Sequence, residues 1–188
     1  MFYIAILNDE INEITSCSLL FYTHLFNGIR RSVEAQALKA IFTDIDGVLN
    51  CSSTKERVYN SKIIGVEDVF IERLKKIVDA TGAKIVLTSS WKLFWEEDND
   101  NNQIKYLRER LKEHGLELYD RTFDRGNNRG YGILKYVGHN DVSRWAVLDD
   151  DVFDDYKVFG ILNHFVGTDW KRGLSDEDVE KAIGYING

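Results

Sequence analysis

Several features that would place the chain in a special class are missing from its 188 residues. Proline is absent, and the two cysteines, Cys17 and Cys51, are too few for a disulfide framework and too far apart for a metal-spaced pair. No run of 18 or more apolar residues is present, so no membrane-spanning helix is expected. The N-terminus lacks the basic start and cleavage site of a signal peptide. Together with the scarcity of cysteine, this favours a cytoplasmic location.

Positive charge is also in deficit. The chain has 24 lysines and arginines against 31 aspartates and glutamates, which gives a formal net charge of -7. An acidic surface repels phosphate backbones at long range, so general nucleic-acid binding is not expected, although a local basic groove is not excluded. The hydrophobic share of 44% is enough to build one compact core.

A regular alternation of strand and helix patterns begins at Lys39. Short apolar runs predict strands at 39–46, 83–90, 116–120 and 143–151, with one or two more at 156–160 and 163–168. Helical spacing predicts helices at 66–82, 101–115, 130–138 and 175–187, and the acidic stretch 96–102 reads as a loop and helix start. This order predicts a three-layer α/β/α, Rossmann-like fold with a mostly parallel sheet over residues 39–188. Residues 1–38 form an N-terminal extension, either an extra helix on the core or translated upstream sequence.

Three of the predicted strands end in polar, reactive residues. Asp44 and Asp46 end the first strand, residues 88–90 (Thr-Ser-Ser) end the second, and the three aspartates at 149–151 end the fourth. In a parallel sheet these carboxyl ends meet at one edge, where ligands bind. Of the first pair, one carboxylate could attack phosphorus while the other handles the leaving-group proton.

The same edge offers ligands for a cation and contacts for a phosphate. Asp44, Asp149 and Asp150 could hold one Mg²⁺, a hard ion that prefers oxygen ligands. Thr88 could donate its hydroxyl to a phosphoryl oxygen. A basic side chain is also needed to bridge phosphate and nucleophile, and Arg129 is the first choice and Lys135 the second.

Each of these residues also has an ordinary structural interpretation. A lone Asp-x-Asp is usually a solvated turn, three consecutive aspartates could be an acidic loop, and strand ends often carry Ser or Thr. Lys92 is either a contact to the substrate phosphate or a solvated lysine. The aromatic residues Trp91, Phe94 and Trp95 could lie in the core or at the rim of the site.

In this order, the segments TDIDGVLN, KIVLTSS and WAVLDDD resemble three motifs of the haloacid dehalogenase superfamily of phosphatases, with Arg129 or Lys135 as the basic third motif between the last two. The resemblance covers residues 39–170. It implies that Asp44 forms an aspartyl-phosphate and that Asp46 protonates the leaving group and then activates water. It also implies that the backbone carbonyl of Asp46 ligates Mg²⁺, and that Thr88, or Ser89 by a one-residue slip, contacts the phosphate.

The wider pattern is similar to a capless branch of that superfamily, which includes domains attached to RNA-repair proteins. The glycine-rich segment 125–132 departs from the usual third motif. Only residues 50–65 are left as a flap beside the nucleophile, in which Lys55, Arg57 and Tyr59 could meet the substrate.

The expected function is a Mg²⁺-dependent phosphomonoester hydrolase that acts on a phosphorylated partner. A nucleotide, a nucleic-acid terminal phosphate, a sugar phosphate or a phosphoprotein would each fit. The alternatives are a receiver-like signalling domain that accepts a phosphate, and a non-catalytic binding module that kept the fold.

Overall fold

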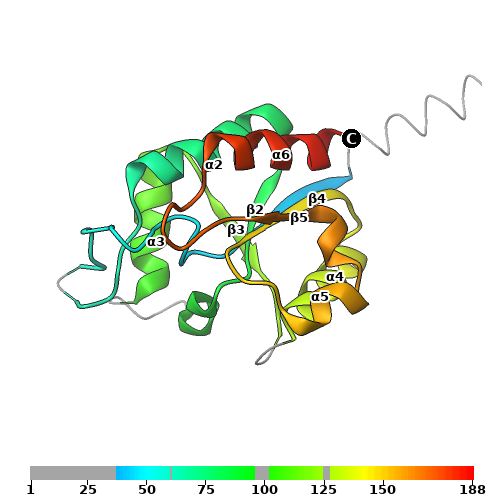
Figure 1. Cartoon of the computed structure of the whole chain (residues 1–188), viewed down its shortest axis with the longest axis horizontal. Coiled ribbons are helices and arrows are strands. Elements are labelled where there is room, and N and C mark those ends of the chain that lie inside the picture. The colour runs from blue at the N-terminus through cyan, green and yellow to red at the C-terminus, as the bar shows by residue number, and fades with distance from the viewer. Residues whose placement is uncertain (1–36, 60, 96–101, 125–127) are drawn as a thin grey trace, which may run out of the picture. The chain divides into compact units, whose positions relative to one another are not determined.

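The computed structural model of the chain describes residues 37–59, 61–95, 102–124 and 128–188. The expectations for residues 1–36 and for the acidic stretch 96–101 lie outside the described residues. The described part contains a five-stranded sheet in which every strand pair is parallel, in the order β3-β2-β1-β4-β5. Figure 1 shows this sheet between α6 and the pair of helices α4 and α5. The strands are β1 (Leu38–Thr43), β2 (Lys84–Leu87), β3 (Leu118–Arg121), β4 (Val142–Asp149) and β5 (Phe165–Gly167).

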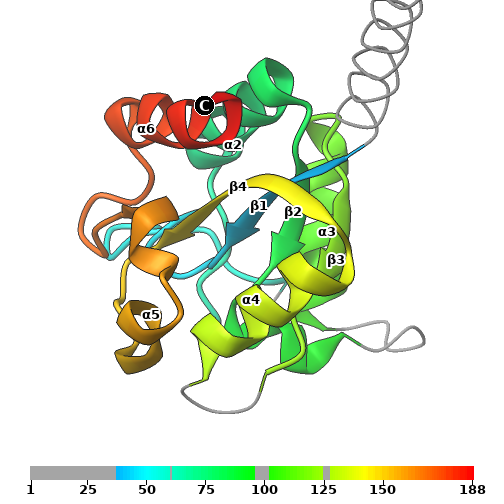
Figure 2. The same cartoon turned by 90° about the vertical axis from the view of Figure 1, so that its right-hand side faces the viewer.

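Helices cover both faces of this sheet, as Figure 2 shows, with α2 and α6 on one face and α4 and α5 on the other. They are α2 (Asp68–Thr81), α3 (Gln103–Glu113), α4 (Arg129–His139), α5 (Asp154–Val158) and α6 (Asp176–Asn187). Two short 3-10 helices, η1 (Ser90–Phe94) and η2 (Ile161–His164), follow β2 and α5. The predicted three-layer α/β/α fold is therefore confirmed, and the described residues contain no cap domain.

The central strand β1 explains why the apolar run after Lys39 is continuous rather than alternating. Successive side chains of a strand point to opposite faces. Ile41 packs into the core beneath α2, α3 and α6, whereas Ala40 and Phe42 pack into the second core beneath α4 and α5. Each of these three side chains is fully buried. A strand covered on both faces has no polar side, and this is typical of parallel sheets.

Local signals in the sequence set several helix ends. Gly82 follows α2 in the left-handed conformation with φ 70°, which costs glycine no Cβ strain. Ser175 and Asp178 form a reciprocal capping box at the start of α6, in which each side chain accepts a backbone N–H of the other residue. A capping residue of this kind is worth about 1 kcal/mol. The predicted terminal helix and its cap are thus confirmed.

The predicted strand at 156–160 is wrong, because the structure forms the helix α5 over Asp154–Val158 instead. Tyr156 is buried and Phe159 packs against the same core, while Lys157 and Val158 between them are exposed, which is the i, i+3 spacing of a helical turn. A short apolar run does not distinguish a strand from a buried helical turn by its periodicity. Only the later of the two candidate segments forms a strand, at β5.

Within the described residues, no helix combines the length and apolarity that crossing a membrane would require.

Candidate functional site

The site forms where the order of the sheet reverses. From β1 the chain moves outward to β2 and β3, and it then returns to place β4 on the other side of β1. Thr43 pairs with Leu148, and the backbone N–H of Asp44 donates to the Leu148 carbonyl at 2.8 Å. The residues that follow these two strand positions, Asp44 and Asp149, are therefore neighbours at the carboxyl edge, the usual ligand site of such sheets.

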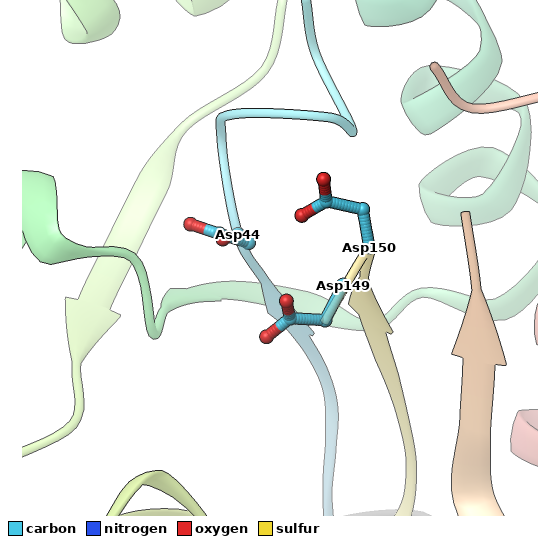
Figure 3. A group of neighbouring side chains, drawn as sticks. All are labelled: Asp44, Asp149 and Asp150. Atoms are coloured by element: carbon cyan, nitrogen blue, oxygen red, sulfur yellow. The ribbon is translucent and has the colours of Figure 1, made fainter. Parts of the chain in front are cut away.

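Three carboxylates gather at this edge, as Figure 3 shows. One oxygen each from Asp44, Asp149 and Asp150 lies within 4.8 Å of the other two. Burial, followed by the negative charge of Asp44, raises the pKa of Asp149 to about 6, and burial also raises the pKa of Asp150. Like charges held this close in a buried place favour a positive counter-charge between them.

Arg129, the first residue of α4, supplies one positive charge to this cluster. Its guanidinium donates to Asp44 Oδ2 at 3.1 Å and also to Asp149 Oδ2. The arginine is nearly buried, and the charges of Asp44 and Asp149 outweigh this burial and raise its pKa. The structure therefore brings the first of the two candidate basic residues to the acidic cluster.

Helix α5 holds Arg129 in place, which the sequence did not indicate. Both carboxylate oxygens of Asp155 accept backbone N–H groups at the start of α4, from Gly130 at 3.1 Å and from Tyr131 at 2.9 Å. A carboxylate at this end of a helix also interacts favourably with the helix dipole. The ring of Phe153, directly before α5, lies 4.2 Å from the Arg129 guanidinium. The wrongly predicted strand is thus a helix that positions the arginine of the site.

Asp46 accepts hydrogen bonds from two side-chain donors. The indole N–H of Trp91 donates to Asp46 Oδ2 at 3.1 Å, and the side-chain amide of Asn50 donates to Asp46 Oδ1 at 2.9 Å. Trp91 and Asn50 are both buried, so these donors are fixed by packing. Each carboxylate oxygen keeps a second lone pair that could carry a proton. The sequence assigned Trp91 only to the core or the rim, and it gave no signal for Asn50.

Gly47 allows the loop after β1 to pass close to the acidic cluster. Its φ of +74° lies in the left-handed region, and an added Cβ would lie 2.3 Å from the carboxyl carbon of Asp150. Only glycine meets both conditions without displacing Asp150. The glycine of the Asp-x-Asp-Gly motif is therefore required by steric constraints at this position.

The end of β2 contributes a hydroxyl group that has no partner. Thr88 is fully buried, and its hydroxyl oxygen makes no hydrogen bond to any described residue, although its backbone N–H donates to the Thr43 carbonyl at 2.9 Å. The hydroxyl of Ser89 accepts the backbone N–H of Trp91 at 3.3 Å and caps η1. Of the two candidate contacts for a phosphoryl oxygen, Thr88 is therefore the one with a free hydroxyl.

The two candidate lysines lie in different environments. Lys92 is buried, and its ammonium donates to the Thr88 carbonyl at 2.9 Å and to Asp124 at 2.7 Å. The interpretation of Lys92 as a solvated lysine is therefore wrong. Lys135 is exposed on α4, where it lines a surface cavity together with Asp120 and Tyr136. The structure does not bring Lys135 to the acidic cluster.

The flap residues have partners elsewhere. Arg57 donates to the carbonyls of Thr54 and Glu56 within the flap. The hydroxyl of Tyr59 donates to Glu109 on α3 at 3.1 Å. Lys55 is exposed. Arg57 thus contacts the flap, and Tyr59 contacts α3.

The donor set at this edge fits a hard divalent cation. Asp44, Asp149 and Asp150 offer only oxygen ligands, and a single guanidinium does not balance three carboxylates. Mg²⁺ prefers such oxygen ligands and is commonly held by one or two carboxylates with several waters. These three residues could therefore hold Mg²⁺ at the end of β1 and β4.

Comparison with known proteins identifies the family of this domain. No curated protein sequence matches the chain. The family model described as the HAD domain in Swiss Army Knife RNA repair proteins matches residues 40–179, which include every residue of the site. The resemblance to the haloacid dehalogenase superfamily is thereby confirmed. The chain belongs to the family of HAD domains found in Swiss Army Knife RNA repair proteins.

Proposed function

We propose that this domain is a Mg²⁺-dependent phosphomonoester hydrolase that works through an aspartyl-phosphate on Asp44. The observation that carries the proposal is the convergence of Asp44, Asp149 and Asp150 within 4.8 Å, with Arg129 against two of them. Phosphoryl transfer needs a positioned nucleophile and concentrated positive charge, and this cluster can offer both. Family membership supports a phosphatase-type function in general terms.

In the first step, a carboxylate oxygen of Asp44 attacks the phosphorus atom while the ester bond between phosphorus and the leaving group breaks. Asp44 is held for this attack, since its Oδ1 accepts the backbone N–H of Ile45 at 2.8 Å and its Oδ2 accepts Arg129. The leaving alkoxide takes a proton from the carboxyl group of Asp46. The free hydroxyl of Thr88 donates to a phosphoryl oxygen.

In the second step, Asp46 is a carboxylate and accepts a proton from water. The water oxygen attacks the phosphorus atom, and the bond between phosphorus and Asp44 breaks. Inorganic phosphate leaves, and both aspartates return to their starting states. The hydrogen bonds from Trp91 and Asn50 support this role, because they hold the Asp46 carboxylate in one orientation.

Asp44, Asp149 and Asp150, with the backbone carbonyl of Asp46, would hold the metal ion. When bound, Mg²⁺ supplies positive charge that offsets the repulsion between the Asp44 carboxylate and the phosphoryl oxygens. Burial and neighbouring carboxylates raise the pKa values of Asp149 and Asp150, so a bound cation would stabilise their charged forms.

The substrate that this site supports best carries a terminal phosphate of a nucleotide or of a nucleic acid. Without a cap domain among the described residues, the carboxyl edge of the sheet can receive a phosphate attached to a large molecule. The family description, which names RNA repair proteins, points in the same direction.

The test is a phosphate-release screen with Mg²⁺ over phosphomonoesters of increasing size. We expect the wild type to turn over, Asp44→Asn to release no phosphate and Asp46→Asn to be severely slowed. The matched control is Asp79→Asn, an exposed aspartate on α2 that pairs with Lys75, and it should retain full activity. Full activity of Asp44→Asn would disprove the mechanism.

Two further measurements separate the alternatives. If Mg²⁺ binds at the cluster, it raises the melting temperature of the wild type by mass action, and Asp150→Asn reduces the shift. A receiver-like domain would keep the phosphate on Asp44 and release almost none, which mass spectrometry of the intact chain would detect. A binding module would bind the phosphoester without phosphorylating Asp44.

A further inference from the structure

Two surface cavities adjoin at the exposed ring of Phe123, whose side chain is 67% exposed. The inner cavity, of about 210 Å³, is lined by Lys92, Leu93, Arg121 and Asp124 together with Phe123. The outer cavity, of about 340 Å³, lies between the end of β3 and α4. Apart from Lys92 and Lys135, none of these residues was singled out by the sequence. The large, exposed aromatic side chain of Phe123 thus lines both cavities, so a ligand that contacts it can occupy either one.

The inner cavity begins beside the reacting centre. Its buried residue Lys92 donates to the backbone carbonyl of Thr88, the residue whose free hydroxyl would contact the phosphate. Burial lowers the pKa of Lys92, and the charges of Arg129 and Asp44 act on the same ammonium group. A substrate whose phosphate lies at Asp44 therefore has its leaving group within reach of this cavity.

The chemistry of the inner cavity favours a flat, neutral ring over a second phosphate. Lys92 and Asp124 form an ion pair at 2.7 Å with both side chains buried, so their charges cancel. Above this pair, the exposed side chains of Phe123 and Leu93 present apolar surface, and Leu93 is 73% exposed. Exposed aromatic faces of this kind are the usual stacking surface for nucleobases.

The ring of Phe123 has a cationic neighbour, Arg121. The Arg121 guanidinium lies 5.1 Å from its centre and 5.3 Å from the ring of Trp95. Arg121 is itself anchored, because it donates to the carbonyls of Lys92 at 2.9 Å and of Trp95 at 3.0 Å. A pre-positioned ring loses little freedom when a base stacks on it, which improves binding.

The outer cavity extends from Phe123 along α4 and includes the ammonium group of Lys135. Lys135 and His139 are four residues apart on α4 and so share one helix face, and both line the cavity. Its carboxylate, Asp120, already accepts the Tyr136 hydroxyl at 3.0 Å and the backbone N–H of Arg121 at 2.8 Å. Lys135 is therefore available to a phosphate of a chain that runs past Phe123.

We propose that Phe123 and the two cavities beside it bind the nucleotides next to the reacting phosphate, with a base stacked on Phe123 and a following phosphodiester at Lys135. This inference rests on the proposed phosphatase function and names its substrate as a single-stranded oligonucleotide with a terminal phosphate. A sugar phosphate fills neither cavity, and a free mononucleotide has no following phosphodiester for Lys135.

The test compares kcat/KM for 3′- and 5′-phosphorylated oligonucleotides, the matching mononucleotides and ribose 5-phosphate. Stacking of a base on an aromatic side chain corresponds to about 5- to 150-fold in affinity. We expect Phe123→Ala to lower the preference for the oligonucleotide over ribose 5-phosphate by that factor, mainly through KM, and Phe123→Trp to retain it. The matched control is Tyr119→Ala, an aromatic residue on β3 that is also about half exposed and lines neither cavity.

The role of Lys135 is tested by the salt dependence of oligonucleotide binding to the wild-type and variant proteins. Loss of one phosphate contact on a single strand lowers the slope of log K against log salt by about 0.7. Lys135→Gln should show this change, whereas Lys181→Gln, on α6 at the opposite face of the sheet, should not.

The outcomes distinguish the subsite from the phosphatase function itself. If Phe123→Ala leaves the preference for the oligonucleotide unchanged, or if a phosphopeptide is the better substrate, the subsite proposal is wrong while the Asp44 mechanism stands. If Asp44→Asn releases phosphate as fast as the wild type, the phosphatase function fails first, whatever the behaviour of Phe123.

Discussion

The hydrogen bond from Trp91 to Asp46 makes a sharp prediction about proton transfer. In Trp91→Phe the aromatic ring remains in the core, but the indole N–H that reaches Asp46 Oδ2 at 3.1 Å is lost. A hydrogen bond to a charged group is worth about 1.5–3 kcal/mol. If the full free energy of this hydrogen bond stabilises Asp46 in the transition state, its loss lowers the rate constant of aspartyl-phosphate formation by about 10- to 150-fold.

The assay compares two substrates that differ in how much the leaving group needs a proton. p-Nitrophenolate leaves as a stable anion, whereas an alkoxide such as that of ribose 5-phosphate requires the proton of Asp46. Since kcat/KM reports the steps up to the first irreversible one, it isolates the formation of the aspartyl-phosphate. We expect Trp91→Phe to lower kcat/KM strongly for ribose 5-phosphate and much less for p-nitrophenyl phosphate.

A structural effect must be separated from a catalytic one. Trp91 is only 2% exposed, so its replacement by the smaller phenylalanine also costs about 1–3 kcal/mol of stability. Thermal unfolding of each variant therefore gives the folded fraction by which rates are corrected. Trp145→Phe serves as the control, because Trp145 is also buried but its ring contacts Phe42 and His164 rather than Asp46. Equal losses of kcat/KM on both substrates, after this correction, would refute the positioning of Asp46 by Trp91.

Two further predictions concern the loop beside the acidic cluster and the response to pH. Gly47→Ala places a Cβ 2.3 Å from the Asp150 carboxyl carbon at a φ of +74°, so it should lower the free energy of unfolding by about 1–3 kcal/mol. Because Asp150 is displaced, the Mg²⁺-induced shift in melting temperature should also be smaller, and an unchanged shift would contradict the assigned ligand set. Burial lowers the pKa of His164, which stacks on Trp145 at 3.9 Å, below its ordinary value of 6.5. The unfolded chain then protonates His164 at a higher pH than the folded chain does. The free energy of unfolding therefore keeps its full value above pH 6.5 and falls as the pH drops from 6.5 toward the lowered pKa of the folded state. Urea unfolding on both sides of this window should show a smaller pH dependence in His164→Gln, and an identical dependence in both proteins would show that His164 is not responsible.

Much of the fold could be predicted because its signals are local. The apolar run that forms β1 is continuous since both faces of that strand are covered, and the helices α2, α3 and α6 show helical spacing of their buried residues. The Asp-x-Asp-Gly segment after β1 and the three aspartates after β4 are also short sequence patterns. Parallel strands bring their carboxyl ends to one edge, so the meeting of Asp44 with Asp149 and Asp150 could be expected from strand order alone.

The choice between alternatives needed the tertiary structure. Nothing in the spacing of residues 125–135 distinguishes Arg129 from Lys135, and only the placement of α4 against β4 brings Arg129 to Asp149. Likewise, only the structure shows that Ser89 caps η1, whereas the buried hydroxyl of Thr88 has no hydrogen-bond partner among the described residues.

Local patterns of burial and backbone geometry were enough to predict the order of the elements and the acidic edge of the sheet, because these patterns repeat along a short stretch of chain. The tertiary structure decided which partners hold those acids: Trp91 on Asp46 from 45 residues away, and Arg129 on Asp44 from 85 residues away. It also decided that residues 154–158 form a helix that supports α4 rather than a strand. Contacts between residues so distant in the chain depend on how separate elements pack together, and no local pattern records that packing.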